Sequence, residues 1–294
     1  MILLTGGTGF VGSTIVRKSQ ERNLKVRCLV RKNGALNAPL QEIGVETVEG
    51  DILKPETLDR GMEGVSVVIH LVGIRLEIGD ANYERIHFEG TKNIVDAAKR
   101  AGVKRYIHMS ALGVREGSRS RYFQTKWKAE EYVRSSSLQY TIFRPSIIFG
   151  QKDEFLNMFA KQIRFSPIVP IVAPKTLFQP IWVEDVAECF LRAIEKKETI
   201  GMEYELAGLD RISMENLINA IVEAKKTWRL KIHLPMPMMK VNAFLFEKLL
   251  PRPPVTRDNL INLEEDNIGD PEPMMRDFGI VPRRVGEYLA ERFG

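Results

Sequence analysis

The sequence predicts an α/β fold built on a doubly wound parallel sheet, followed by a less regular second half. Strand-like apolar runs alternate with amphipathic helical runs through roughly the first half of the chain. A glycine-rich turn joins the first strand to the first helix, and the alternation ends before a proline-punctuated stretch at 165–179. The expected boundaries are 1–150 with 180–207 for the main domain, and 151–179 with 208–294 for the smaller, substrate-binding lobe.

The first strand, MILL, runs into a glycine cluster and then into an amphipathic helix over 11–22. Two patterns overlap there: Gly6, Gly9 and Gly12 form G-x-x-G-x-x-G, and Gly7 begins G-x-G-x-x-G. Glycine tolerates a positive φ and lets a pyrophosphate approach the backbone. The N–H groups at the helix start would face that anion. A glycine-rich turn also occurs in α/β proteins that bind no nucleotide, but its place between strand and helix favours dinucleotide binding.

Residues 24–30 (LKVRCLV) form the second predicted strand. The position that usually contacts the adenosine ribose lies about 20 residues beyond the glycines, at the end of this strand. Arg31 and Lys32 stand there, with no acidic residue. A carboxylate would repel a 2′-phosphate, whereas an arginine can bind one through two hydrogen bonds. The sequence therefore favours NADP(H) over NAD(H); the alternative is a solvated loop pair.

A third, short strand is expected within 44–52, which ends in Gly50-Asp51-Ile52. We place Asp51 and Ile52 among the cofactor-binding residues. The Asp51 carboxylate would accept from the adenine amino group, or it would instead cap the turn at 55–60.

Residues 65–73 (VSVVIHLVG) are almost continuously apolar, as in a central parallel strand. Ligands of such sheets bind beyond the carboxyl ends of the strands. Leu71, Val72 and Gly73 would therefore face the cofactor. A helix is expected over 83–100, where apolar residues recur at helical spacing.

Ser110 closes the fifth predicted strand, 104–110, and so lies on the same edge of the sheet. Tyr122 and Lys126 follow in a helical pattern that continues to Arg134, four residues apart and hence on one helix face. Tyr-x-x-x-Lys is a common pattern by chance, and the alternative is a tyrosine packed on the sheet beside a solvated lysine. Because the Tyr-x-x-x-Lys pattern follows a dinucleotide turn and a serine that ends a strand, we favour a catalytic role for the pair.

These three residue types suit proton transfer coupled to hydride transfer. A phenol with a pKa near 10 is a poor base, but a nearby ammonium and a nicotinamide cation would lower its pKa. Tyr122 would then exchange a proton with a substrate oxygen that also accepts a hydrogen bond from Ser110. Lys126 would additionally bind the nicotinamide ribose.

The second half of the chain is less regular. A sixth strand within 139–150 precedes the proline-rich stretch, a helix is expected over 184–196 and a short strand over 202–207, and Ser213 is a plausible N-cap for a helix over 214–226.

Residues 235–254 form an apolar stretch with an amphipathic helix pattern. We favour a lid helix packed on the smaller lobe; the alternative is a surface that meets a lipid, a quinone or a partner subunit. Arg252 and Arg257 flank it as candidate anion contacts or ordinary surface arginines.

The composition narrows the classes of partner. The net charge is +5, from 43 basic and 38 acidic residues, without a basic block interleaved with aromatics, so nucleic-acid binding is not expected. Cys28 and Cys189 lie far apart and are predicted to be inert core thiols in a reducing compartment. The four histidines lack ligand spacing, so no metal site is expected.

The sequence contains no run of about 18 apolar residues, so no membrane-spanning helix is predicted. The first strand begins at Met1, so we expect no leader peptide. The expected location is the cytoplasm, either free or peripheral to a membrane.

Together, several motifs resemble the extended or atypical short-chain dehydrogenase/reductase superfamily, in its NAD-dependent epimerase/dehydratase branch. The motifs are TGGTGFVG at 5–12, GDI at 50–52, GTKN at 90–93, SALG at 110–113, YFQTK at 122–126, RPSIIFG at 144–150 and PIWVEDVA at 180–187. The tail LPRPPVTRDNLINLEEDNI, residues 250–268, resembles bacterial homologues of the NADPH-binding accessory subunit of respiratory complex I.

The resemblance implies an NADP-binding Rossmann domain and a small discontinuous C-terminal lobe, with Ser110, Tyr122 and Lys126 as the catalytic set. The cofactor contacts that it implies are Gly6, Thr8, Gly9, Phe10, Val11, Gly12, Arg31, Asp51, Lys126 and Pro145. The sequence departs from the superfamily at His87, where asparagine is usual, and in HLVG at 70–73, where small alanines are usual. These departures bear on the proton relay and not on cofactor binding.

Two functions follow as hypotheses. The first is an NADP(H)-dependent oxidoreductase or epimerase acting on a small hydroxyl or carbonyl substrate such as a nucleotide-sugar. The second is a non-catalytic or regulatory NADPH-binding accessory or assembly factor. The expected state is a monomer or a homodimer.

Overall fold

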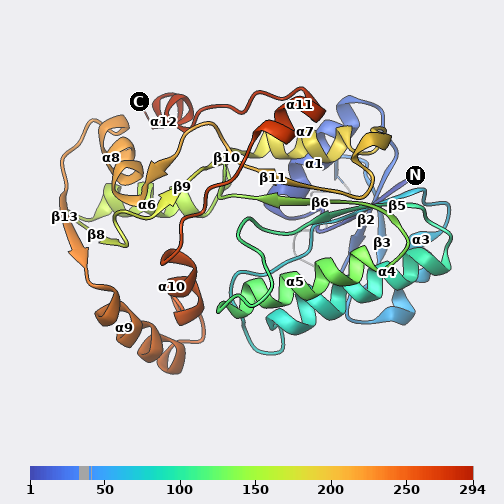
Figure 1. The fold of residues 1–294 in the computed structure, drawn as a ribbon, viewed down its shortest axis with the longest axis horizontal. Helices are drawn as coiled ribbons and strands as arrows, with labels where there is room; N and C mark the ends of the chain where they lie inside the picture. Colours follow the sequence, from blue (N-terminus) through green and yellow to red (C-terminus); the bar gives the residue numbers. More distant parts are fainter. Residues whose placement is uncertain (33–39, 41, 294) are drawn as a thin grey trace.

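A computed structural model describes residues 1–32, 40 and 42–293 of the 294-residue chain and confirms the predicted α/β fold (Figure 1). A seven-stranded sheet forms its centre, and every neighbouring pair of strands runs parallel. In spatial order the strands are β11 (Met202–Leu206), β6 (Gln139–Pro145), β5 (Arg105–Met109), β4 (Val67–His70), β1 (Ile2–Thr5), β2 (Val26–Val30) and β3 (Glu46–Glu49).

Helices cover both faces of this sheet, which explains why β1 and β4 are buried along their whole length. In Figure 1 one helical layer lies above the sheet and the other below it. The upper layer consists of α1 (Phe10–Glu21), α7 (Val183–Arg192) and α11 (Glu272–Phe278). The lower layer consists of α3 (Asp59–Met62), α4 (Gly90–Arg100) and α5 (Arg121–Arg134).

The order of the strands changes direction at β1. Strands β2 and β3 are added on one side of β1, and strands β4, β5, β6 and β11 are added on the other. In open parallel sheets the crevice at such a reversal is where ligands bind. The glycine turn that follows β1 lies at this point.

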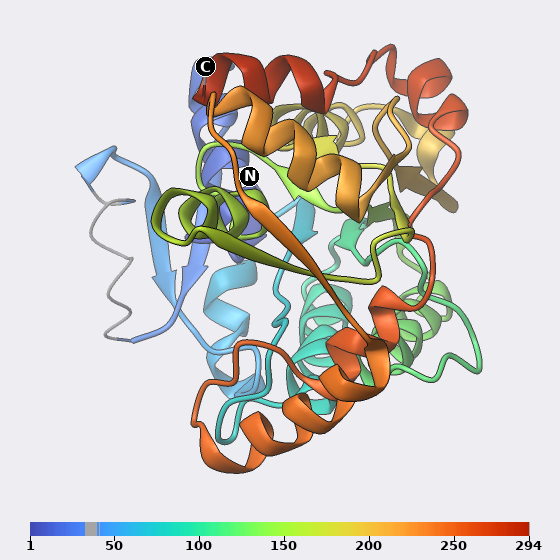
Figure 2. The same cartoon turned by 90° about the vertical axis from the view of Figure 1, so that its left-hand side faces the viewer.

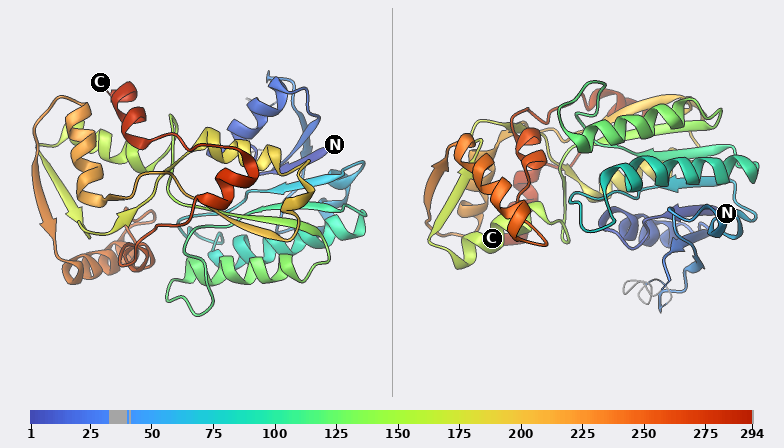
Figure 3. Two further views of the ribbon diagram at one scale, coloured as in Figure 1. Left: turned by 45° about the horizontal axis from the view of Figure 1, so that its top comes forward. Right: turned by 90° about the horizontal axis from the view of Figure 1, so that it is seen from below.

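The remaining elements form a smaller lobe at the left of Figure 1 and in both views of Figure 3. Its apolar cluster is built from α6, β8, α8 and α12. The lobe elements are β7 (Ile148–Phe149), α6 (Phe155–Phe165), β8 (Ile168–Val172), β9 (Leu177–Phe178), β10 (Ile181–Trp182), β12 (Ile212–Ser213), α8 (Met214–Ala224), β13 (Leu230–Leu234), α9 (Met236–Leu249), α10 (Arg257–Leu263) and α12 (Val285–Phe293).

The expected strands and helices agree with the structure, with small shifts at their ends. The one interruption is in the helix predicted over 83–100, which begins as a π-helical turn, η2 (Glu84–Glu89), before α4. Ser213 is the N-cap of α8 as predicted, because its hydroxyl accepts from the Asn216 N–H at 3.2 Å. Two short 3₁₀ helices complete the fold, η1 (Pro55–Thr57) and η3 (Lys197–Thr199).

The end of the chain returns to the main domain. Met274 and Phe278 of α11 are fully buried in the cluster between the sheet and the upper helical layer, whereas the sequence analysis placed this segment in the smaller lobe. Cys28 and Cys189 are both buried and unpaired, and burial raises the pKa of the Cys28 thiol to about 12, as expected for an inert thiol. No helix in the described ranges has both the length and the apolar character needed to cross a bilayer.

Three histidines are buried within or beside the sheet. His70 and His108 stack across β4 and β5 with ring centroids 5.6 Å apart, and neither ring nitrogen of His108 has a hydrogen-bond partner among the described residues. Burial lowers the pKa of His70 to about 3 and that of His87 to about 2, and it lowers the pKa of His108 well below its usual value. All three rings are therefore neutral in the folded protein.

Stability should therefore fall steeply in mild acid. Unfolded histidines take up protons below about pH 6.5 and the folded ones do not, so the unfolded state binds about three more protons and is favoured as the pH falls. Between pH 7.5 and 5.5 we expect the free energy of unfolding to drop by about 4 kcal/mol, measured by urea titration. His108→Leu should remove about a third of this drop, whereas His233→Gln, which alters an exposed ring, should leave it unchanged. A drop that is the same in the wild type and in His108→Leu would contradict the assignment.

Candidate active site

The glycine turn after β1 brings α1 unusually close to the strand. Gly6 has a φ of +81°, and its carbonyl accepts from the Gly9 N–H at 3.0 Å. A Cβ added at Gly12 would lie 2.1 Å from the Gly6 carbonyl oxygen, so no side chain fits there. Gly9 is the N-cap of α1 and supplies no side-chain cap, and the first turn of α1 holds no acidic residue. The N-terminus of α1 thus offers backbone N–H groups and a positive dipole end to an anion.

The segment after β4 lies directly against this turn. A Cβ at Gly6 would be 3.3 Å from the Leu71 Cβ, and the Leu71 N–H donates to the Thr5 carbonyl. Leu71 is buried, Val72 is partly exposed and Gly73 is exposed. The structure therefore brings the predicted residues of the first and fourth strand ends together at the crevice.

Three other predicted cofactor residues occupy the ends of neighbouring strands. Arg31 and Lys32 follow β2 directly and are exposed. The Asp51 carboxylate accepts from the Leu53 N–H at 3.0 Å, and η1 has no side-chain cap, so Asp51 orders its own turn and does not cap the next one. Its proposed contact with adenine stays a prediction.

Ser110 and Lys126 meet at the end of β5. Lys126 Nζ donates to the carbonyl of Met109, the residue before Ser110, at 3.0 Å. A Cβ at Gly73 would lie 3.2 Å from the same nitrogen, so the ammonium sits between the ends of β4 and β5. The Ser110 hydroxyl is buried and has no hydrogen-bond partner within the described ranges. A buried unpaired hydroxyl is costly, so it indicates a place where a ligand oxygen is expected.

Tyr122 lies one turn before Lys126 on α5 and is half-buried. Its ring packs edge-on against His87, with centroids 5.1 Å apart. Burial raises the pKa of Tyr122 to about 12; nearby Arg75 lowers it and Asp258 raises it further. The lowered pKa that the sequence predicts for the complex with a nicotinamide cation stays a prediction.

Burial also affects Lys126, which is 3% exposed. Desolvation lowers the pKa of Lys126 to about 8, and the carboxylate of Glu130 partly offsets this effect. The Lys126 amine is thus mostly protonated at neutral pH, although burial makes its charged form less favourable than it is in water.

His87, the departure from the superfamily pattern, is a structural link. His87 Nδ1 lies 3.0 Å from the Thr125 hydroxyl. On the other side of the ring, Nε2 lies 3.1 Å from the Ile74 N–H nitrogen and 3.0 Å from the Ile74 carbonyl oxygen. The neutral ring therefore ties α5 to the chain just after Gly73.

The sequence analysis missed Asp258, which comes from α10 in the smaller lobe. Its carboxylate accepts from the Ser120 hydroxyl at 2.9 Å and from the backbone N–H groups of Arg121 and Tyr122 at 2.7 and 3.3 Å. An acidic side chain at a helix N-terminus is stabilising. This residue lies in the tail that carries the resemblance to the complex I subunit, and it holds the start of the helix that bears Tyr122 and Lys126.

A second contact fixes the same tail to the loop that follows Ser110. Asn267 accepts from the Ser146 hydroxyl at 2.6 Å and donates to the Leu112 carbonyl at 3.2 Å. The Leu112 N–H donates in turn to the carbonyl of Pro145, the last residue of β6 and a predicted cofactor contact. The tail therefore joins the two strand ends that border the predicted reaction site.

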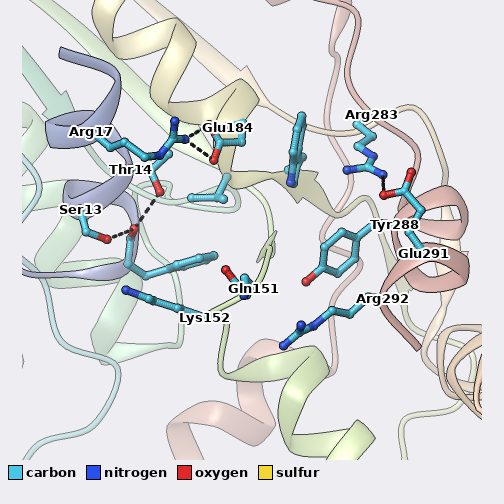
Figure 4. Close-up of a pocket in the computed structure, with 13 residues that line it drawn as sticks. Ser13, Thr14, Arg17, Gln151, Lys152, Glu184, Arg283, Tyr288, Glu291 and Arg292 are labelled. Carbon is cyan, nitrogen blue, oxygen red and sulfur yellow. Dashed lines mark hydrogen bonds and ion pairs between the residues drawn. The ribbon is translucent and has the colours of Figure 1, made fainter. Parts of the chain in front are cut away.

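A pocket of about 520 Å³ lies on the other side of α1, between α1, α7 and α12 (Figure 4). Phe10 and Trp182 line it, and ion pairs of Arg17 with Glu184 and of Arg283 with Glu291 border it. Ser110, Tyr122 and Lys126 are not among its lining residues. It is therefore a cavity separate from the predicted reaction site.

Comparisons with known proteins identify a family model, homologous proteins and similar solved structures. A family model described as NAD(P)H-binding matches residues 6–164. The chain is 29% identical over 306 residues to NADH dehydrogenase [ubiquinone] 1 alpha subcomplex subunit 9 of Arabidopsis thaliana, covering 97% of this chain and 75% of that protein. This homology confirms the resemblance to the complex I subunit.

A second relative is named as an enzyme. Over 188 residues the chain is 34% identical to the ceramide reductase of Caulobacter vibrioides, which corresponds to 64% of this chain and 58% of the relative. Among solved structures, the NADPH-dependent quinone oxidoreductase QOR2 of Escherichia coli, complexed with NADPH, superposes with a TM-score of 0.78 at 18% identity, with full coverage of both chains. That likeness confirms the fold.

Replacing Gly12 with alanine should disrupt the nucleotide turn. The added Cβ would collide with the backbone of Gly6, and we expect a loss of about 3 kcal/mol in stability together with the loss of NADPH binding, measured by thermal shift and fluorescence titration. Gly286→Ala is the matched control, because none of the described atoms lies within 4 Å of its added Cβ. NADPH binding that persists unchanged in Gly12→Ala would refute the role assigned to the turn.

Proposed function

The chain belongs to the NAD(P)H-binding family, and from this premise we propose that it is an NADP(H)-dependent reductase of a carbonyl substrate, with Ser110, Tyr122 and Lys126 as its catalytic residues. The observation that carries the proposal is the buried, unpaired hydroxyl of Ser110, one residue from the carbonyl that binds the Lys126 ammonium. A hydroxyl without a partner beside a buried cation is an arrangement suited to a substrate oxygen.

The turn at Gly6–Gly12 fits a dinucleotide. Backbone N–H groups at the start of α1 would bind the pyrophosphate, and the exposed Arg31 after β2 would bind a 2′-phosphate. Lys126 would bind the nicotinamide ribose, and Leu71, Val72, Gly73 and Pro145 would border the nicotinamide half. When bound, the reduced nicotinamide supplies hydride.

The chain's own residues would supply the proton that the substrate oxygen takes up. With a pKa near 12, Tyr122 stays protonated at neutral pH, and a protonated phenol donates to a carbonyl oxygen as that oxygen gains negative charge. Ser110 would donate a second hydrogen bond to the same oxygen and orient it. The Lys126 ammonium would stabilise the phenolate that remains.

A second candidate function is a non-catalytic NADPH-binding accessory protein. The homology with a complex I subunit covers almost the whole chain, whereas the homology with the ceramide reductase covers 64% of it. In that case the nucleotide would stabilise the main domain, and Lys126 and Tyr122 would serve only to hold it.

Tyr122→Phe separates the two functions. If the protein is a reductase, the variant should lose at least about 100-fold in kcat while its NADPH affinity stays the same, because only the proton donor is removed. Activity is measured as NADPH oxidation with a panel of aldehydes, ketones and quinones. Tyr140→Phe is the matched control, since Tyr140 lies at the opposite end of β6 from Pro145. If the wild type oxidises no NADPH with any of these compounds but binds NADPH with a rise in melting temperature, the accessory function stands.

Arg31→Asp tests the preference for NADP(H). The substitution should weaken NADPH binding at least about tenfold more than NADH binding, because it replaces a cation with a charge that repels the 2′-phosphate. Lys25→Asp is the control, since Lys25 precedes β2 at the opposite edge of the sheet. Equal losses for both nucleotides, measured by titration calorimetry, would refute the 2′-phosphate contact.

A further inference from the structure

The far end of the smaller lobe exposes an unusual number of large apolar side chains. Figure 2 looks directly onto this end: β13 crosses it and α9 lies along its lower edge. We call it the apolar end surface. Its exposed residues are Trp228, Leu230, Ile232, Met238, Val241, Phe244, Leu245, Leu249 and Leu250. Contiguous apolar surface of this kind marks a place where a protein meets a partner or a membrane.

The outward side of α9 carries an apolar stripe. Met238, Val241, Leu245 and Leu249 recur at spacings of three and four, and Val241 and Leu249 are 60% and 75% exposed. Ala243 is the buried residue of the helix. A lid helix would bury such a stripe, so α9 is amphipathic with its apolar face turned outward.

The small sheet beside α9 is arranged in the same way. β13 pairs with β8, and Lys231 and His233 on one face of β13 contact Asn219 and Glu215 of α8. The opposite face therefore points away from the lobe. Leu230 and Ile232 lie on this outer face, and both are exposed.

Basic residues surround the apolar end surface. Residues 225–257 contain eight lysines and arginines and one acid, Glu247, which is paired with Arg257 at 2.7 Å. The Lys248 ammonium lies over the Phe244 ring, 4.4 Å from its centroid, so a cation contacts one of the apolar side chains of this surface directly. An outward apolar helix face flanked by cations is typical of helices that lie in the interface of an anionic bilayer.

We infer that the apolar end surface binds anionic phospholipid membranes, with α9 lying in the interface and the main domain held away from it. The positive charge of this segment favours an anionic membrane over a second copy of the chain as the partner of the surface. A symmetric dimer through this surface would bring the two basic segments together, and their repulsion opposes it. A bilayer that contains acidic lipids supplies both an apolar layer for the stripe and the counter-charge for the cations.

Vesicle co-sedimentation tests the inference on the full chain. We expect binding to vesicles of phosphatidylcholine with phosphatidylglycerol, weaker binding in high salt, and little binding to phosphatidylcholine alone. Val241→Asp with Leu245→Asp should lower the partition at least about tenfold, because each change removes an apolar side chain from the interface. Val281→Asp is the matched control, since Val281 is 72% exposed but lies outside this surface.

Trp228 provides a second measurement that needs no disruptive variant. It is 75% exposed, so its fluorescence emission should shift to shorter wavelength when the wild type binds the anionic vesicles. Trp228→Phe should abolish the shift. The inference is overturned if binding does not depend on the acidic lipid or if the aspartate pair binds like the wild type. It is also overturned if light scattering shows a dimer that the aspartate pair dissociates, because a second copy would then cover the surface.

Discussion

The close approach of α1 to β1 is the constraint on which the nucleotide end of the molecule depends. At Gly12 the helix passes so near the Gly6 carbonyl that any side chain would overlap it. This contact turns the start of α1 toward the crevice between the β1 and β4 ends, where the sheet order reverses. Leu71 packs beside Gly6, so the glycine turn also positions the segment after β4. Gly73 in that segment lies next to the Lys126 ammonium.

The C-terminal tail supplies the second constraint. Asp258 binds the N-terminus of α5, and Asn267 binds the loop after β5 and the turn after β6. Both residues belong to the part of the sequence that resembles the complex I subunit. The tail thus contacts the start of the helix that bears Tyr122 and Lys126. In the proposed reductase, the smaller lobe would therefore help to position the helix that carries the proposed catalytic residues.

Buried polar groups accumulate around the same helix. Lys126 keeps its charge despite burial, His87 stays neutral between Thr125 and Ile74, and Ser110 has no partner of its own. Each is a cost to folding when the site is empty, since a buried polar or charged group loses its hydration. A ligand that bears an oxygen and a ribose would offset part of this cost.

The sequence by itself determined the sheet, its helices and the residues at its strand ends, because those depend on local periodicity and on glycine at positions where no side chain fits. It also determined that Tyr122 and Lys126 share a helix face, which follows from their spacing. Tertiary structure alone decided the electrostatics and the long-range contacts. Burial raises the pKa of Tyr122, and Asp258 contacts the start of α5 although it lies 136 residues after Tyr122 in the chain. The outward orientation of α9 likewise depends on what packs beneath it, since an amphipathic pattern specifies two faces but not which one meets the protein.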